Sequence, residues 1–151
     1  MNAPAYVEFA VQSNFSFLRG ASKPEELVAT AALLGHAGIG LADRNTVAGV
    51  VRAWSQSKHI KLSTDAEPVT LPYHQGARLV FCDGTPDVLA YPRDRQGWGH
   101  LCRLLTQANL RDESPKGAPL LFLGDLLEFG DCMSLAILPD PEVDTDETLV
   151  L

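Results

Sequence analysis

The chain lacks the closely spaced histidines and cysteines that most protein metal sites use. No CxxC, HxH or HExxH pair occurs, and the phosphate-binding GxxxxGK and GxGxxG loops and the nucleophile motif GxSxG are also missing. An odd number of separate cysteines predicts reduced, mostly buried thiols rather than a disulfide framework. The cysteines are Cys82, Cys102 and Cys132, and the histidines are His36, His59, His74 and His100. The residues alone therefore display no motif for metal, phosphate or serine chemistry.

Long apolar runs are also absent. Asp, Arg, Gly or Pro interrupts every apolar stretch well before the roughly 20 residues of a membrane span. The first residues, Met1–Tyr6, have neither the basic region nor the apolar core of a signal peptide. A hydrophobic fraction of 46% and a charged fraction of 21% are ordinary for a globular protein. The sequence predicts a cytoplasmic protein, long enough for one domain with a core.

Positive charge is scarce for a surface that would bind nucleic acid. The net charge is −7, and the segment from Asp131 to Leu151 holds six acidic residues with no Lys or Arg. The first 130 residues have 12 bases against 13 acids, which leaves a charge of −1. Clustered Lys and Arg drive phosphate binding by releasing counterions. We therefore expect this segment to bind DNA weakly or not at all by itself.

The first half of the chain alternates strand and helix patterns. Strands are predicted over Tyr6–Val11, which alternates, and Ala37–Ala42, which is short and apolar. Ser22 and Glu25 have the spacing of a capping box for a helix that ends at Gly35. Val47, Val50, Val51 and Trp54 stand at helical spacing and predict the next helix, with Trp54 packed in the core. This order favours parallel pairing and an α/β fold.

The second half adds a hairpin, a long helix and a further strand. In order, we predict a loop over Ser63–Gln75, strands over Ala77–Phe81 and Asp87–Tyr91, a helix over Asp94–Ala108, a polar loop over Asp112–Pro119, a short helix capped by Asp125, and a strand over Met133–Leu138. The hairpin makes the predicted sheet mixed. An apolar ending, Leu149–Leu151, after an acidic stretch resembles an interrupted strand, so we expect the native chain to be longer.

Position alone singles out Asp43. It follows the second predicted strand directly, and active sites in parallel α/β folds collect at the carboxyl ends of strands. The alternatives are an N-cap for a helix that starts near Thr46, or a turn-forming aspartate.

Several segments in the same order resemble the PHP (polymerase and histidinol phosphatase) domain. They are Asn14-Phe-Ser-Phe-Leu-Arg-Gly-Ala-Ser22 with Pro24–Leu27, Leu41-Ala-Asp-Arg-Asn45 with Val47–Arg52, Gly76–Leu79, Leu89–Pro92 and Gly99–Thr106. Their residues are similar to those of the N-terminal PHP domain of bacterial C-family DNA polymerase III alpha subunits, of the error-prone type. The likeness covers Tyr6 to roughly Leu138 apart from the Ser63–Gln75 loop, which assigns 1–138 to the first part of a PHP domain and 139–151 to an acidic segment leading into the remainder.

The resemblance implies a partial, distorted β/α barrel with a mixed, mainly parallel sheet and flanking helices. In metal-competent relatives this barrel holds three metal ions and acts as a phosphoesterase or exonuclease. Nucleotidyl transfer, with its Mg²⁺, belongs to later domains of the parent polymerase. The resemblance therefore implies a structural segment without a cofactor of its own, in a parent that synthesises DNA past lesions and takes part in DNA repair.

The ligand positions of active relatives are altered here. Active relatives have a His-x-His motif after the first strand, where this chain has Ala10 and Gln12. They have Asp-His after the second strand, where this chain has Asp43 and Arg44. They have a carboxylate in the next strand, where this chain has Arg78. A guanidinium offers no lone pair and stays charged, so it cannot ligate a metal. The resemblance therefore predicts no catalytic residue and no metal ligand. An uncompensated buried carboxylate is costly, so we predict that Arg78, rather than Arg44, pairs with Asp43.

Two other functions remain open at this point. One is a free-standing, metal-dependent PHP phosphoesterase, and the other is a small interaction module unrelated to polymerases. For the leading hypothesis, the expected partners are the remainder of the polymerase chain and, through the parent, DNA. Uncovered strand edges also predict some self-association of this segment when isolated.

Overall fold

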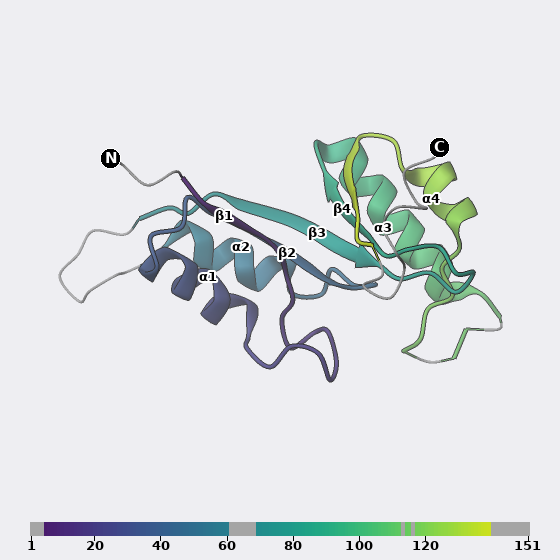
Figure 1. The fold of residues 1–151 in the computed structure, drawn as a ribbon, viewed down its shortest axis with the longest axis horizontal. Coiled ribbons are helices and arrows are strands. Elements are labelled where there is room, and N and C mark those ends of the chain that lie inside the picture. Colours follow the sequence, from purple (N-terminus) through teal and green to yellow (C-terminus); the bar gives the residue numbers. More distant parts are fainter. Residues whose placement is uncertain (1–4, 61–68, 113, 116, 140–151) are drawn as a thin grey trace. The chain divides into compact units, whose positions relative to one another are not determined.

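The computed structural model of the chain describes residues 5–60, 69–112, 114–115 and 117–139. The chain divides into two compact units, Met1–Ala77 and Arg78–Leu151 (Figure 1). Hydrogen-bonded strands follow the order β1-β2-β3-β4-β5, with helices between them in the chain. The predicted α/β class is confirmed.

The first unit begins with two parallel strands, β1 (Val7–Val11) and β2 (Gly38–Arg44). Their register shifts between Glu8 and Val11, so β1 contains a bulge. Ala10 lies in this bulge with φ at +66°, a conformation that side chains other than glycine rarely adopt. Strand β1 lies where the alternating pattern predicted it, whereas β2 continues beyond the predicted end at Ala42 and includes Asp43.

Helix α1 (Pro24–Leu33) begins one residue later than the predicted capping box. Lys23 is the N-cap, and its backbone N–H donates to the Glu26 carboxylate at 2.9 Å. The box of Ser22 and Glu25 is therefore wrong by one position. The N-terminal turn needs an acceptor three residues after its cap, and once Lys23 is the cap Glu26 occupies that place.

The predicted end of α1 at Gly35 is confirmed. Gly35 has φ at +74°, where glycine pays no steric cost. Its N–H donates to the Ala32 carbonyl, and the N–H of His36 donates to the Ala31 carbonyl, both at 3.0 Å. These paired bonds satisfy carbonyls that the helix end would otherwise leave open.

Helix α2 (Val50–Lys58) buries a different face from the predicted one. Ala53 and Ser57 are fully buried, whereas Val51 and Trp54 are 74% and 54% exposed. Helix α2 packs against α1 (Figure 1), and small side chains let two helices approach closely. The helix predicted from the apolar spacing is present, but the prediction that Trp54 packs in the core is wrong.

The core of the first unit lies between α1, α2 and the strands. Its fully or nearly buried members are Val28, Ala31, Ile39, Leu41, Ala53, Ile60 and Leu71. Strand β3 (Tyr73–Leu79) starts earlier than predicted, so the end of the expected Ser63–Gln75 loop is a strand. Residues 61–68 of that loop lie outside the described part of the chain.

The second unit contains β4 (Val88–Pro92), α3 (Arg95–Leu110), α4 (Leu123–Phe129) and β5 (Met133–Ile137). Strands β4 and β5 are antiparallel, which confirms a mixed sheet. Helix α3 packs on β4 and on α4, and its buried side chains include Leu101, Leu104, Leu105 and Ala108. Asp94 caps α3 by accepting from the Gly97 N–H at 2.8 Å.

The three cysteines are free, but the expectation of mostly buried thiols is wrong. Cys82 is exposed, and Cys102 and Cys132 are half-buried. None of the described helices is both long and apolar enough to cross a bilayer.

Candidate functional site

The candidate site lies at the carboxyl ends of β1 and β2. These strands run parallel, so Gln12 and Ser13, which follow β1, come beside Asp43 near the end of β2. Asp43 is 3% exposed, whereas Arg44 is exposed. The structure therefore confirms that Asp43 occupies the position which the sequence singled out, and that it is buried there.

Serine residues and one backbone amide satisfy the Asp43 carboxylate. Its Oδ1 accepts from the backbone N–H of Ser13 at 2.7 Å and from the hydroxyl of Ser16 at 2.6 Å. Its Oδ2 accepts from the hydroxyl of Ser13 at 2.7 Å. Ser13 and Ser16 are themselves fully buried. Three short bonds to a carboxylate are strong, because hydrogen bonds to a charged group exceed neutral ones.

This network folds the loop between β1 and α1, residues 12–23, into a fixed shape. The Ser16 hydroxyl also accepts from the Arg44 N–H at 3.0 Å, which joins the loop to the end of β2. The Asn14 N–H donates to the Ser22 carbonyl at 2.9 Å and closes the base of the loop. Gly20 packs so tightly on the backbone of Ser13 that any Cβ at this position would overlap the Ser13 carbonyl oxygen.

Asp43 is neither a cap nor a partner of the predicted arginine. Helix α2 starts at Val50 with Gly49 as its N-cap, so the helix expected from Thr46 begins later. Arg78 donates from Nε to Asp87 Oδ2 at 2.7 Å within the second unit. The predicted Asp43–Arg78 ion pair is therefore wrong. Hydroxyls and an amide meet the carboxylate's need for donors, so no cation is required.

The side chains at the altered ligand positions do not fit the metal cluster that the family resemblance implies. Ala10 has no donor atom, and Arg44 and Arg78 carry a positive charge without a lone pair. Asp43 already accepts three hydrogen bonds from the loop. Among the residues that the structure describes, no three His, Cys, Asp or Glu side chains gather as a metal site would require.

A second buried carboxylate, Asp125, lies in the second unit. Arg111 donates to both of its oxygens, with Nη1 at 3.0 Å from Oδ2, and the Phe122 N–H donates to Oδ2 at 2.8 Å. Burial acts to raise the pKa of Asp125, but the hydrogen bonds from Arg111 and Phe122 and the charge of Arg111 outweigh it and lower this pKa. The same contact raises the pKa of Arg111. Arg111 also lies 4.9 Å from the centre of the Phe122 ring.

Asp125 therefore combines a predicted and an unpredicted role. As the third residue of α4 it accepts from the residue before the helix, which agrees with the predicted helix-capping function. Its ion pair with Arg111, which lies 14 residues earlier, has no local sequence signal. The pair joins the end of α3 to the start of α4.

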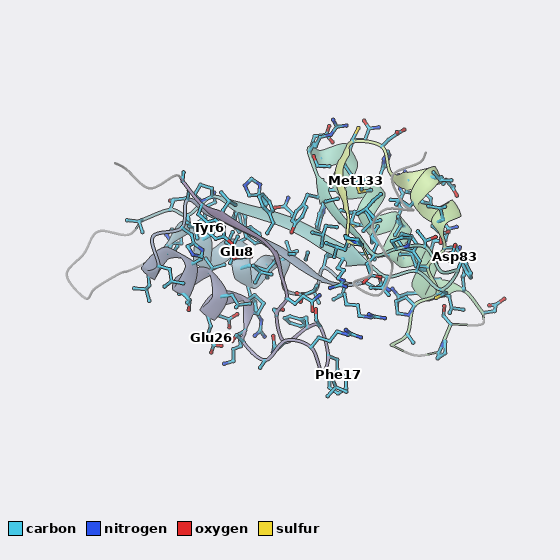
Figure 2. The ribbon with its side chains drawn as sticks, viewed as in Figure 1. Tyr6, Glu8, Phe17, Glu26, Asp83 and Met133 are labelled. Atoms are coloured by element: carbon cyan, nitrogen blue, oxygen red, sulfur yellow. The ribbon has the colours of Figure 1, made fainter. Side chains whose placement is uncertain are left out.

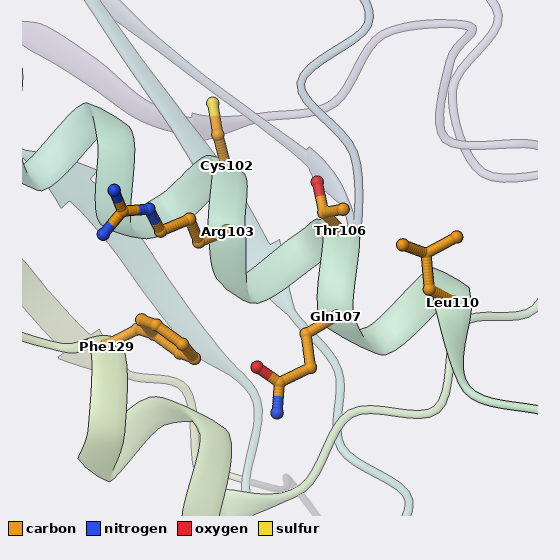
Figure 3. Close-up of a pocket in the computed structure, with 6 residues that line it drawn as sticks. All are labelled: Cys102, Arg103, Thr106, Gln107, Leu110 and Phe129. Carbon is orange, nitrogen blue, oxygen red and sulfur yellow. The ribbon is translucent and has the colours of Figure 1, made fainter.

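A pocket of about 470 Å³ lies along α3 in the second unit (Figure 3). Phe129 of α4 faces the side chains of α3 across it. The residues lining it are Cys102, Arg103, Thr106, Gln107, Leu110 and Phe129. Burial raises the pKa of the Cys102 thiol, which makes it a poorer nucleophile. This lining supplies no carboxylate or imidazole for acid–base catalysis.

The PHP domain family matches residues 8–128. The chain belongs to the PHP domain family.

Known proteins similar to the chain include error-prone DNA polymerases. The chain is 66% identical over 146 residues to the enzyme of Mesorhizobium japonicum and 52% identical over 136 residues to that of Sinorhizobium medicae. These matches cover 97% and 90% of this chain but only 12% and 11% of the relatives. The chain thus spans little more than a tenth of the length of these relatives.

Two solved structures share the fold. One is a candidate metal-dependent phosphoesterase from Bifidobacterium adolescentis, with a TM-score of 0.53, 25% identity, and coverage of 71% of this chain and 34% of the other. The second is an amidohydrolase from Chromobacterium violaceum, with a TM-score of 0.52, 20% identity and coverage of 70% and 34%. Both likenesses support the α/β fold expected of a PHP domain.

Sequence reasoning missed Ser13 and Ser16. Ser16 belongs to the segment Asn14–Ser22, and Ser13 directly precedes it. Both follow the first predicted strand, which was expected to pair in parallel with the strand before Asp43. Small hydroxyl residues following a neighbouring strand are the signal that could have suggested them as donors.

Proposed function

We propose that this chain is a non-catalytic, structural PHP segment of an error-prone DNA polymerase. The observation that supports this proposal most is that the buried Asp43 carboxylate is hydrogen-bonded to Ser13 and Ser16. The one ligand-type residue retained at the altered positions has both carboxylate oxygens bonded to the β1–α1 loop. In this role Asp43 stabilises a loop and does not hold a reacting group.

The parent polymerase would supply the chemistry. We propose that it transfers nucleotides to a DNA primer at a Mg²⁺-dependent centre outside this chain, acts in the cytoplasm, and serves DNA repair and synthesis past damage. The relatives' name and the small share of their length that the chain covers support this proposal. Contact of this segment with DNA would be weak, because residues 1–77 carry six basic and six acidic residues.

A free-standing phosphoesterase is disfavoured by the same residues. Such an enzyme needs ligands that bind metal and a path for the attacking water. Arg44 and Arg78 place cationic groups at two of the altered positions, and Asp43 is committed to hydrogen bonds within the protein. The likeness to a candidate phosphoesterase covers 34% of that protein and concerns the shared fold.

The test uses the full-length native protein and its Asp43→Asn variant. We expect primer extension with Mg²⁺ in both, assayed well below the variant's unfolding temperature. We also expect that hydrolysis of a p-nitrophenyl phosphate ester stays at background with Mg²⁺, Mn²⁺ or Zn²⁺. A Mn²⁺- or Zn²⁺-stimulated hydrolysis that Asp43→Asn abolishes would show that the PHP segment is catalytic. A native gene that ends at Leu151 would contradict the polymerase parent.

A further inference from the structure

The outer end of the β1–α1 loop exposes two large apolar side chains. Phe17 is 83% exposed and Leu18 is 89% exposed, more than any other large apolar residue that the structure describes. Figure 2 shows Phe17 at the outermost point of this loop, directed away from the strands. Large exposed apolar side chains that lie together often mark an interaction surface.

The backbone beneath these side chains is held in place. Ser16 accepts at its carbonyl from the N–H groups of Arg19 and Gly20, at 2.9 and 3.0 Å, and its own N–H donates to the Ser13 carbonyl at 2.9 Å. Its hydroxyl is bonded to Asp43. Leu18 has φ at +60°, an unfavourable conformation for leucine. Such conformations persist where the surroundings impose them, and they cluster at functional positions.

Unpaired positive charge lies on the same loop and beside it. Arg19 and Arg44 are exposed, and within the described residues neither has a carboxylate at ion-pair distance. Arg44 is adjacent to the loop, since its N–H donates to the Ser16 hydroxyl. Aromatic and arginine side chains dominate the binding energy of protein interfaces. The complementary surface would be an apolar pocket with carboxylates at its rim.

The rest of the parent chain fits as the occupant. The chain accounts for 12% of the length of a 66% identical polymerase, so most of such a protein lies outside it. DNA fits less well, because residues 1–77 have no net charge and a leucine offers no ring for base stacking. A loop fixed before binding loses little entropy when it docks.

We propose that Phe17 and Leu18 insert into an apolar pocket, rimmed by acidic residues, in the portion of the same polymerase chain that lies beyond this segment. Arg19 and Arg44 pair with the rim. The Asp43–Ser13–Ser16 network holds the loop in the shape that docks. This inference rests on the proposed function, because it requires a longer polymerase chain.

The test places a photo-cross-linking residue in the full-length protein as Phe17→benzoylphenylalanine. We expect irradiation to join position 17 to a peptide from beyond residue 151 of the same chain, without DNA. As a second measurement, Phe17→Ser with Leu18→Asn should raise at least threefold the rate at which a protease cuts between the PHP segment and the remainder. Asparagine tolerates the φ of residue 18. Val51→Ser, at an apolar side chain of α2 that is 74% exposed, is the matched control and should leave this rate unchanged.

Each other outcome overturns the inference. A cross-link that forms only with a primer–template indicates a DNA contact, and one between two chains indicates a self-association surface. Absence of any cross-link in a protein that extends primers rejects the docking loop and leaves the proposed function standing. A native chain that ends at Leu151 rejects both.

Discussion

Within the described residues, each of the two units buries one aspartate, and different donors stabilise the two carboxylates. In the first unit, Asp43 accepts from two hydroxyls and one amide. In the second, Asp125 accepts from the guanidinium of Arg111 and one amide. A buried carboxylate needs donors, and either neutral dipoles or a cation can supply them. The sequence correctly predicted that a buried Asp43 needs hydrogen-bond donors. It predicted a cation in that role, whereas the structure has two hydroxyls and an amide.

The largest expected effect is at the neutral network. Asp43→Ala leaves the Ser13 amide and two buried hydroxyls without their acceptor, and we expect a loss of about 4 kcal/mol in the free energy of unfolding. Urea denaturation of the full-length protein measures this loss, and hydrogen exchange follows the transition of the PHP segment itself. Val51→Ser, at a side chain of α2 that is 74% exposed, is the control and should change stability by less than about 0.5 kcal/mol. Equal effects of the two variants would mean that Asp43 does not organise the loop.

The charged pair comes next. Arg111→Met removes the guanidinium and leaves Asp125, whose side chain is 5% exposed, with one donor. We expect a loss of about 3 kcal/mol, because breaking a buried ion pair strands the remaining charge. Arg111→Lys restores the charge without the paired geometry and should recover only part of the loss. Full recovery by lysine in the same denaturation measurement would show that charge alone matters.

Acid should weaken the Arg111–Asp125 pair. The pKa of Asp125 is lowered in the folded protein, so its stabilisation is complete above the unfolded value of about 3.9 and is lost as pH falls through the folded pKa. The stability gap between the native protein and Arg111→Met should therefore narrow as pH falls below about 4. Thermal unfolding between neutral pH and pH 3 measures that gap. A gap that stays constant over this range would contradict the assigned pKa direction.

The smallest effect is expected at Arg78. Its partner is Asp87, and the two side chains are 32% and 21% exposed, so water screens the pair and Arg78→Ala should cost no more than about 1 kcal/mol. A double-mutant cycle should couple Arg78 to Asp87 and not to Asp43. Coupling of Arg78 to Asp43 above about 0.5 kcal/mol would revive the ion pair that the structure contradicts.

Much of the fold was predictable because the signals were local. Glycine at position 35 ends α1 through its own backbone freedom, and Asp94 caps α3 by reaching an amide three residues away. Errors appeared where the choice depended on neighbours in space. Val51 and Trp54 of α2 are exposed because Ala53 and Ser57 form the face that is buried. A helical period alone cannot decide which face of a helix packs inward.

The amino-acid sequence by itself determined the family, the α/β order and the special position of Asp43, because each depends on residue types at fixed local spacings. Only the tertiary structure decided which donors meet each buried carboxylate. Ser13 is 30 residues from Asp43 in the sequence, and Arg111 is 14 residues from Asp125. Which donor reaches a carboxylate depends on strand pairing and helix packing, since a hydrogen bond requires a separation of about 3 Å that no sequence spacing encodes.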